Sequence, residues 1–444
     1  MTVTSGPALL SVEGARVAVL AAAVPVGVES VAVADAMERV LAEPVTARVS
    51  LPPWPNSAMD GYAIHASDTR GATDAAPVRL AVIGDVRAGV ASELAVGPGT
   101  AARIATGARL PDGADAVVPV EATTPLDTSG QPGPRGRDAS GPLPAACLVH
   151  EVVPVGWSVR DEGSDLRAGD TLLEPGAAIG AARVALLAGA GVEQVSVYRH
   201  PRVAVLATGD EVRAPGEPLG PAGIPDANGP GLRAQVAAAG ADPIDLGIAT
   251  DELDDVLARL RRGLQAGADA IIVSGGVSVG PYDVVKLAMD TIGRVDLWRV
   301  AVQPGKPFAF GVAEDPGDGH PVLVFGLPGN PVSSAVTFEL FVRPAIRRLA
   351  GRRDLLRPAD RAVLDEPVSK GHGRRAYLRV AARRDEAGAP IRDDRGRVVV
   401  RLAGGQGSHV ISALAGADAL AIIPEADDSL PAGAEVALWW LDQP

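Results

Sequence analysis

Three glycine-rich segments have the composition needed to bind a phosphate group. They are residues 208–211 (TGDE), 274–280 (SGGVSVG) and 326–331 (GLPGNP). Each follows a short apolar run, and the last two precede helix-like patterns, so their backbone N–H groups could face an anion at a helix start. The spacing is neither that of a P-loop nor that of a dinucleotide-binding fingerprint. Tight turns need glycine in any case, so only the presence of three such segments favours a phosphate-bearing ligand.

Three carboxylates accompany these segments, namely Glu211, Asp226 and Asp283. Carboxylates beside phosphates commonly hold Mg²⁺, because the cation offsets the repulsion between the anions. Ordinary roles are equally open, since Asp226 could cap the following helix and Asp283 could lie in the first turn of another. Lys306, in the string VQPGKPFAF, is one of three lysines. A solvated lysine in a turn is its ordinary interpretation.

Two further polar segments lie nearer the N-terminus. The first, residues 53–62 (PWPNSAMDGY), places Trp54, Met59 and Tyr62 around one carboxylate, Asp60. Packing is the ordinary role of such a methionine and tyrosine. The second segment, RIATGARLPDG, contains Arg103 and Thr106, either of which could meet an oxyanion. Neither segment supplies a Ser-His-Asp or Cys-His arrangement for nucleophilic catalysis.

Composition narrows the function classes. A net charge of −13 argues against a nucleic-acid or anionic-membrane surface. A single cysteine, Cys147, excludes an internal disulfide, and the six scattered histidines lack zinc-site spacing. There is no uncharged apolar run of membrane-spanning length, and the N-terminus has no basic segment before an apolar one. We therefore expect a soluble cytoplasmic protein with neither nucleic-acid nor membrane partners.

The central part of the chain alternates between strand and helix patterns, which indicates a parallel α/β sheet. In such a sheet the ligand crevice lies beyond the C-terminal ends of the strands, where all three glycine-rich segments fall. The predicted strands are 202–207, 244–249, 270–274 and 322–326, and the predicted helices are 230–239, 251–265, 282–292 and 331–349.

The flanking regions show other patterns. Residues 8–43 have helix-like apolar spacing in two parts, around Val17–Leu20 and over 32–41, whereas 78–122 and 360–444 read as short strands between turns. Residues 124–145 form a Gly/Pro/Ser-rich loop that we expect to be mobile. The predicted class is α/β plus β in a multidomain chain. Its predicted domains are a small α/β linker (8–50 and 152–180), a mostly β domain (51–151), an α/β domain (181–350) and a C-terminal β domain (351–444).

Taken in order, the motifs resemble one family, the molybdopterin molybdenumtransferases or MoeA family, which is related to the C-terminal enzyme domain of gephyrin. The GGVSVGxxD, PGKPFAFG and GLPGNPVS strings together are highly specific. The matching strings include PPWPNSAMDGYAI, RIATGARLPDGADAVVPVE, VRDEGSDLRAGD, LATGDEV, IIVSGGVSVGPYDVVK, VQPGKPFAFG and FGLPGNPVSSAVTFELFVRP, and they span residues 50 to 350.

The resemblance implies an elongated homodimer of four-domain subunits. Its active site would lie between the α/β domain of one subunit and the second domain of the other. The reaction would convert adenylylated molybdopterin and molybdate, with Mg²⁺, to molybdenum cofactor and AMP. The upstream adenylyltransferase is a candidate partner that would deliver the adenylate.

The same resemblance assigns residues to roles. This sequence departs from the family pattern at Gln303, which stands where many members have lysine. Arg299 stands where some members have lysine and keeps the positive charge. The expected catalytic residues are Asp60, Thr106, Asp165, Glu211 and Lys306; the expected substrate-binding residues are Thr208, Gly209, Ser274, Gly275, Gly276, Ser278, Gly280, Arg299, Pro328, Gly329 and Asn330; and the expected metal ligands are Asp226, Asp283 and Glu211.

Two rival functions stay open on sequence alone. The adenylyltransferase that acts one step earlier shares the α/β fold, but the NSAMDGY segment, the Thr106 motif and the β tail go beyond that single-domain enzyme. A gephyrin-like scaffold would use the same fold to bind a partner. Such a scaffold should tolerate substitution of Asp60 and Asp283, whereas an enzyme should not.

Overall fold

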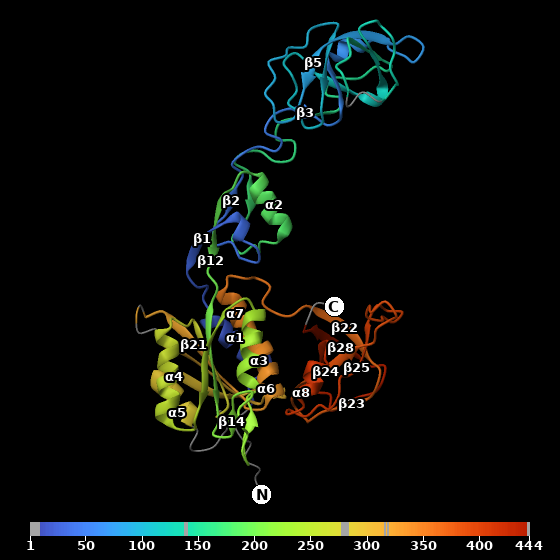
Figure 1. Ribbon diagram of the computed structural model, residues 1–444. Helices are drawn as coiled ribbons and strands as arrows, with labels where there is room; N and C mark the ends of the chain where they lie inside the picture. The colour runs from blue at the N-terminus through green and yellow to red at the C-terminus, as the bar shows by residue number, and fades with distance from the viewer. Residues whose placement is uncertain (1–8, 137–140, 277–283, 315–316, 318, 442–444) are drawn as a thin grey trace.

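The computed structural model describes residues 9–136, 141–276, 284–314, 317 and 319–441, and they form a multidomain chain with separate hydrophobic cores (Figure 1). The largest unit is an α/β domain whose six-stranded sheet has the order β16-β13-β17-β21-β20-β18. Its strands are β13 (Arg202–Thr208), β16 (Asp242–Ala249), β17 (Ala270–Ser274), β18 (Gly293–Arg299), β20 (Pro307–Glu314) and β21 (Pro321–Leu327).

Helices cover both faces of this sheet, as the nearly continuous apolar strands require. In β13, Val203 and Val205 face one core, and Ala204 and Leu206 face the other. The first core contains α1 (Val12–Ala22), α3 (Asn228–Ala238), α6 (Pro331–Thr337) and α7 (Arg343–Leu349), and the second contains α4 (Leu253–Gln265) and α5 (Val284–Ile292).

The sheet is parallel except at one strand, so the prediction of a parallel sheet is corrected there. β20 runs antiparallel to both β21 and β18. The predicted helix 331–349 is also interrupted, by a π-helical turn at Phe338–Val342 between α6 and α7. Pro344 explains this turn, because proline has no N–H to donate within a regular helix.

The linker domain packs around its own small core, in which β1 (Val28–Ala32) pairs antiparallel with β12 (Gln194–Tyr198). Residues 33–35 form a single 3₁₀ turn, so the helix expected over 32–41 is wrong. A second strand pair and one helix complete the domain: β2 (Val45–Thr46) with β11 (Thr171–Leu173), and α2 (Ala181–Gly189).

Packing shifts the expected domain boundaries at three places. Helix α1 belongs to the α/β core rather than to the linker, because Val12, Ala15 and Val19 are buried there. Helix α2 and strand β12 belong to the linker core, so the boundary predicted at residue 181 is too early. Strand β10 (Val159–Arg160) pairs with β3 (Asn56–Ser57), so the β domain extends beyond residue 151.

The β domain is a six-stranded mixed sheet of order β7-β4-β6-β5-β9-β8. Residues 123–126 pair with 146–149, so the loop predicted from residue 124 begins only after Leu126; residues 137–140 of that loop lie outside the described residues. The elements of the β domain are β4 (Gly61–Ile64), η2 (Ala66–Thr69), β5 (Val78–Val86), β6 (Thr100–Ile104), β7 (Ala116–Pro119), η3 (Val120–Ala122), β8 (Thr123–Leu126) and β9 (Ala146–Val149).

The C-terminal domain is a closed barrel, because β24 pairs with both β25 and β26 and the ring continues through β22 and β28. The short strand β19 (Val302–Gln303) of the α/β domain adds to β24 and joins the two domains. The barrel elements are β22 (Ala359–Leu364), β23 (Val368–Ser369), β24 (Arg375–Ala382), β25 (Val398–Leu402), α8 (Ile411–Ala415), β26 (Ala419–Ile423), β27 (Ser429–Leu430) and β28 (Glu435–Trp440).

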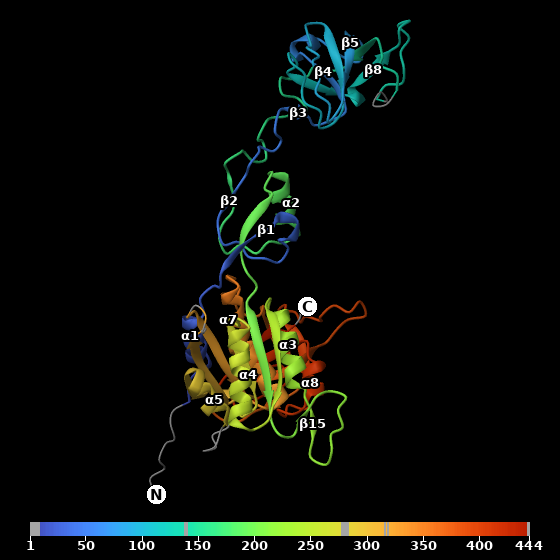
Figure 2. The same cartoon turned by 60° about the vertical axis from the view of Figure 1, so that its left-hand side comes forward.

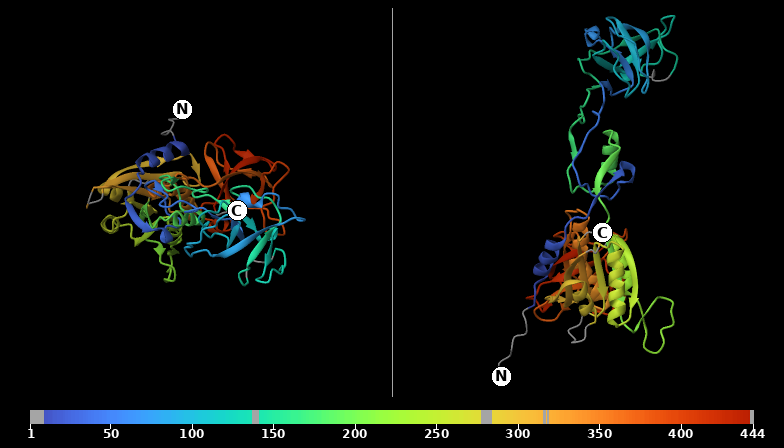
Figure 3. Two further views of the ribbon diagram at one scale, coloured as in Figure 1. Left: turned by 90° about the horizontal axis from the view of Figure 1, so that it is seen from above. Right: turned by 90° about the vertical axis from the view of Figure 1, so that its left-hand side faces the viewer.

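The domains form an elongated molecule. The linker separates the β domain at one end from the α/β domain and the barrel at the other, as all the views agree (Figures 1, 2 and 3). The C-terminal ends of β13 and its parallel neighbours lie at the end of the molecule far from the β domain (Figure 1). Among the described residues, no helix combines the length and apolar composition needed to cross a membrane.

Candidate active site

The three glycine-rich segments meet at one edge of the α/β sheet. They follow β13, β17 and β21, which are adjacent and parallel. Hydrogen bonds join them directly, since the Thr208 hydroxyl donates to the Ser274 carbonyl at 3.3 Å and the Gly275 N–H donates to the Leu327 carbonyl at 3.2 Å. The described parts of the three segments therefore lie together at one edge of the sheet, as expected; residues 277–280 of the second lie outside the described residues.

Asn228, which the sequence reasoning missed, joins two of these segments. Its Nδ2 donates to Ser274 Oγ at 2.8 Å and to the Gly329 carbonyl at 2.7 Å. Ser274 Oγ also lies 3.4 Å from the Pro328 carbonyl and 3.4 Å from Ser334 Oγ. Its position two residues after Asp226, at the start of α3, is the feature of the sequence that could have identified Asn228. Its contacts could not have been predicted, because they depend on how the strands align.

Glycine is required at the centre of this cluster. Gly275 has φ +104, and a Cβ there would lie 2.5 Å from Thr208 Oγ1 and 2.7 Å from the Thr208 carbonyl. A Cβ on Gly329 would lie 3.6 Å from the Gly275 Cα, so the β17 and β21 loops approach at backbone distance. Backbone N–H groups can then face a ligand without side chains between them.

Two of the three expected metal ligands lie on neighbouring segments. Strand β14 (Val212–Arg213) pairs with β15 (Ile224–Pro225), and the Ile224 N–H donates to the Glu211 carbonyl at 2.7 Å. Asp226 stands one residue before Ala227, the N-cap of α3, and its Oδ1 accepts from the Gly229 N–H at 2.8 Å in the first turn, which is an ordinary structural role. Asp283, Ser278 and Gly280 lie outside the described residues.

The donor chemistry at this position suits Mg²⁺. Glu211 is exposed and Asp226 is partly exposed, and neither makes an ion pair with a cationic side chain in the described part of the chain. Mg²⁺ prefers a few carboxylate oxygens and completes its shell with water and phosphate oxygens. Within the described residues, no three His, Cys, Asp or Glu side chains gather into a metal-binding group. Glu211 and Asp226 can therefore supply only part of a coordination shell.

Two cations lie at the same edge of the sheet. Because β18 runs parallel to β21, its last residue Arg299 lies at the edge that carries the glycine-rich loops, and Arg299 pairs with Pro307 at the start of β20. Lys306 directly precedes that strand and is partly buried, while Arg299 is exposed. Gln303 is otherwise engaged, since its Oε1 accepts from the Gly371 N–H of the barrel at 2.9 Å.

A second polar cluster lies in the β domain. Asp60 Oδ1 accepts from both the Thr106 N–H at 2.7 Å and the Thr106 hydroxyl at 2.9 Å, and both residues are exposed. Gly61 allows the Asp60 loop to lie against β7, because a Cβ there would be 2.1 Å from the Val118 carbonyl. Arg103 is not part of this cluster, since its Nε donates to Asp85 at 3.1 Å.

Some sequence neighbours of Asp60 are buried and others are exposed. Tyr62 is fully buried in the core of the β domain, whereas Trp54 and Met59 are 43% and 42% exposed. Asp165 is exposed near the junction with the linker, where its N–H donates to the Leu51 carbonyl at 3.0 Å. No hydrogen bond within the described residues joins Asp165 to Asp60.

The expected site residues therefore fall into two groups at opposite ends of one chain. Thr208, Gly209, Glu211, Ser274–Gly276 and Pro328–Asn330 lie at the α/β edge, with Arg299 and Lys306. Asp60 and Thr106 lie in the β domain beyond the linker (Figure 1). A single chain does not bring the two groups together.

Comparisons with known proteins agree with the motifs. Three family models match this chain: the MoeA N-terminal region (domain I and II) at residues 10–191, the probable molybdopterin binding domain at 204–348, and the MoeA C-terminal region (domain IV) at 361–441. Among similar sequences, molybdopterin molybdenumtransferase 2 of Mycobacterium tuberculosis H37Rv is 37% identical over 416 residues, covering 92% of this chain and 94% of that one. The Haemophilus influenzae molybdopterin molybdenumtransferase is 32% identical, covering 93% and 94%. The crystal structure of the MoeA protein from Pyrococcus horikoshii superposes with a TM-score of 0.78 at 31% identity, covering 98% of this chain and all of that one.

Proposed function

Because the chain belongs to the MoeA family of molybdopterin molybdenumtransferases and inserts molybdenum into molybdopterin in molybdenum cofactor biosynthesis, we propose that its substrates are adenylylated molybdopterin and molybdate, that Mg²⁺ assists, and that AMP is released. The observation that carries this proposal is the meeting of three glycine-rich loops at one sheet edge, beside exposed carboxylates and two cations. The reaction would take place in the cytoplasm, with the adenylate delivered by an upstream adenylyltransferase.

The loops at the edge would hold the phosphate groups of the adenylate. The substrate carries a pyrophosphate link and a pterin phosphate, and the closely packed backbone around Gly275 and Gly329 presents N–H groups without intervening side chains. Asn228 would fix the spacing of two loops, because its amide binds both Ser274 and Gly329. Binding and orientation of the substrate are thus assigned to this edge.

Glu211 and Asp226 would hold Mg²⁺ together with Asp283, which the same family resemblance names as a metal ligand. When bound, the ion would offset the negative charge of the leaving phosphate. The exposed Glu211 carboxylate and the partly exposed Asp226 carboxylate keep their charge available for a cation, since no arginine or lysine of the described chain pairs with them.

Arg299 and Lys306 would attract molybdate. Molybdate is a dianion, and this chain carries a net charge of −13, so local cations are needed to bring the substrate in. Gln303 does not add to this charge, because it is neutral and its Oε1 accepts from Gly371. The sulfurs that bind molybdenum would belong to molybdopterin, which agrees with the lone Cys147 being buried in the β domain.

Asp60 and Thr106 would act on the site of a second copy of the chain. The β domain that carries them is separated by the linker from the α/β domain with its glycine-rich loops (Figure 1), so an antiparallel homodimer is the arrangement that would bring Asp60 to such a site. In that arrangement each active site would combine the α/β edge of one subunit with the β domain of the other. Asp165 would lie near the same composite site.

Incubation of the purified chain with adenylylated molybdopterin, molybdate and Mg²⁺ tests the reaction. We expect molybdenum-containing cofactor and AMP to form together, and Mg²⁺ removal to slow both. Formation of the adenylate from ATP and molybdopterin, without molybdenum insertion, would instead identify the chain as the adenylyltransferase. Binding of substrate with no turnover would favour the scaffold function.

Subunit mixing tests the shared site. Asp60→Ala removes the carboxylate that Thr106 binds in the β domain, and Lys306→Met removes one of the two cations at the α/β edge. In a mixed dimer of the two variants, one of the two sites keeps both residues, so exchange should restore about a quarter of wild-type activity from two inactive proteins. Failure to restore activity in dimers shown to have exchanged would mean that each site is built from one chain.

A further inference from the structure

A hollow of about 1000 Å³ lies where the linker domain, the α/β domain and the barrel meet. Its walls come from residues 178–183 of the linker, the end of α3, one side of α7 and the segment 352–358 that leads to the barrel. Figure 1 shows α7 directly below the linker, at the end of the sheet opposite to the glycine-rich loops. The hollow is therefore separate from the candidate active site.

The charge of this hollow is opposite to that of the chain. Among the described residues that line it, five arginines face two carboxylates, although the whole chain carries a net charge of −13. The arginines are Arg183, Arg343, Arg347, Arg352 and Arg357, and the carboxylates are Glu38 and Asp354.

The arginines are only partly compensated by acidic partners. Arg347 binds Asp354, and Arg357 forms a bidentate pair with Glu339 at 2.8 and 3.1 Å. By contrast, the hydrogen bonds that the described structure gives to Arg352 and Arg183 go to backbone carbonyls, those of Glu38 at 3.0 Å and of Ala178. A guanidinium bound to a carbonyl keeps its full charge, so the surplus faces the hollow.

Arg343 is buried and its hydrogen-bonding capacity is only partly used. It is 6% exposed, its Nη1 donates to the Leu355 carbonyl at 3.2 Å, and its Nε lies 3.7 Å from the Glu339 carboxylate without a hydrogen bond within the described residues. Burial, together with the positive charge of Arg357, lowers the pKa of Arg343 to about 10, against the opposing effect of Glu339. A buried guanidinium with nearby like charges is costly unless an anion offsets it.

The start of helix α2 adds to the positive field. The helix runs over nine residues from Ala181, and its N-cap residue, Gly180, provides no capping side chain. There is no acidic residue in its first turn, and residues 180–183 line the hollow. Free N–H groups at a helix start favour a negative charge and suit phosphate oxygens.

We infer that this hollow binds a small molecule bearing phosphate groups, with pyrophosphate as its simplest representative. Guanidinium groups and a helix start match phosphate oxygens in geometry as well as charge. The most buried arginines, Arg343 at 6% and Arg347 at 9% exposure, suit a small anion that enters the hollow better than an acidic surface laid across it. A bound anion would join the linker to the α/β domain and the barrel.

The binding does not depend on the proposed function, but its consequence for turnover does. The β domain that carries Asp60 is attached through the linker, so fixing the linker against the α/β domain would set how Asp60 meets a partner's site. The inference is therefore tested by binding, measured separately from molybdenum insertion.

The test is titration of the full-length chain with pyrophosphate by isothermal calorimetry. The double variant Arg183→Gln/Arg352→Gln removes two charges that bind only carbonyls in the described structure, and Arg353→Gln is its matched control, because Arg353 also donates to a carbonyl (Pro175, 2.7 Å) but does not line the hollow. We expect saturable binding to the wild type and the control, and a dissociation constant at least about 10-fold higher in the double variant.

The candidate active site also binds phosphates in our proposal, through loops that Asn228 holds together, so Asn228→Ala is titrated in parallel. Retention of pyrophosphate binding in Asn228→Ala and its loss in the double variant would support the inference. Equal affinity of the wild type and the double variant would overturn it, as would loss only in Asn228→Ala. Failure of pyrophosphate to bind while a decaglutamate peptide binds through Arg183 and Arg352 would assign the hollow to an acidic protein segment instead. A pyrophosphate-dependent rise in melting temperature of the wild type gives a second readout if the double variant folds poorly.

Discussion

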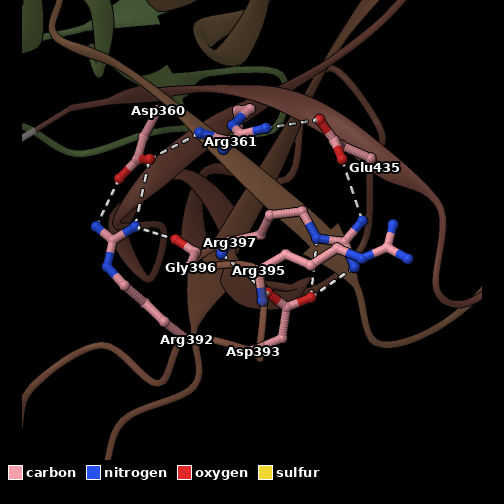
Figure 4. Close-up of polar contacts among 8 residues, drawn as sticks. All are labelled: Asp360, Arg361, Arg392, Asp393, Arg395, Gly396, Arg397 and Glu435. Carbon is pink, nitrogen blue, oxygen red and sulfur yellow. Dashed lines mark hydrogen bonds and ion pairs between the residues drawn. The ribbon is translucent and has the colours of Figure 1, made fainter.

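Acidic residues at the edge of the α/β sheet and acidic residues on the barrel differ in what binds them. On the barrel, Arg392 pairs with Asp360 at 2.7 Å, and Arg397 binds both Asp393 at 2.5 Å and Glu435 at 3.1 Å (Figure 4). At the α/β edge, Asp226 is held by a backbone N–H, and Glu211 makes no ion pair in the described part of the chain.

The difference separates carboxylates that serve the fold from those available to a ligand. Hydrogen bonds from Arg397 lower the pKa of Asp393 to about 2, so its charge is already offset within the barrel. A carboxylate held only by an N–H or a hydroxyl, as Asp226 and Asp60 are, keeps a net charge that a cation or a reacting group can use. Because both sets reach solvent, the type of partner separates them whereas exposure does not.

The strongest test of this comparison is Asp60→Asn against Asp393→Asn. The side-chain oxygen of the asparagine introduced by Asp60→Asn can still accept from the Thr106 N–H and hydroxyl, so the loop should stay folded while the charge is lost. We expect molybdenum insertion to fall by about 100-fold or more, on the scale of removing one group that acts in the transition state. The measurement is the rate of cofactor formation with a circular dichroism check of folding.

Asp393→Asn is the matched control, because it removes a charge paired within the barrel. Its activity should stay within about 2-fold of the wild type, as surface ion pairs contribute little. Equal losses in the two variants would mean that partner type does not distinguish functional carboxylates in this chain.

A second test compares two glycines with positive φ. Gly275, at the edge, has no room for a Cβ beside Thr208, whereas Gly396, in the barrel turn next to Arg397, has φ +76 and no atom within 4 Å of a Cβ. Gly275→Ala should cost about 2 kcal/mol or more in unfolding free energy and most of the activity, and Gly396→Ala about 1 kcal/mol with activity retained. Chemical denaturation measures both. Equal costs would show that the close approach at Thr208 relaxes without consequence.

A third test separates the two roles of Asp226, which are its observed bond at the start of α3 and its proposed binding of Mg²⁺. Asparagine also caps helices well, so Asp226→Asn should keep the bond to the Gly229 N–H and the stability of the protein. If Asp226 also holds Mg²⁺, the Mg²⁺ concentration for half-maximal rate should rise by about 10-fold. Asp226→Ala should add a loss of about 1 kcal/mol in stability. An unchanged Mg²⁺ dependence in Asp226→Asn would leave this residue as a helix cap only.

The edge of the α/β sheet that carries the glycine-rich segments was more predictable from sequence than the domain boundaries. Glycine-rich segments after apolar strands must gather where parallel strands end, so their meeting follows from local pattern and one rule of sheet topology. Strand β12 could not be assigned in this way, because its partner β1 lies 166 residues earlier, measured from Val28 to Gln194. Local patterns carry no information about such distant pairing.

Side-chain contacts between different elements also could not be predicted from the sequence. The bond between Asp60 and Thr106 depends on β4 lying between β6 and β7. The amide contacts of Asn228 likewise depend on the alignment of α3 with two loops. The resemblance to the MoeA family identified Asp60 and Thr106 as candidates, but only the sheet order shows that they touch.

The smallest expected effect is the pH dependence of the barrel pair itself. The folded pKa of Asp393, about 2, lies below its ordinary value of 3.8, chiefly because of hydrogen bonds from Arg397. A depressed pKa means that the pair stabilises the folded barrel above the ordinary value, and that this contribution is lost as the pH falls through the folded pKa. The melting temperature of the wild type should therefore exceed that of Asp393→Asn by a small, constant amount above pH 5, and the gap should close between about pH 4 and pH 2. Scanning calorimetry of both proteins across this range measures the gap. A gap that persists unchanged at pH 2 would show that Asp393 acts through hydrogen-bond geometry rather than charge, and the contrast with the α/β edge would then have to rest on geometry as well.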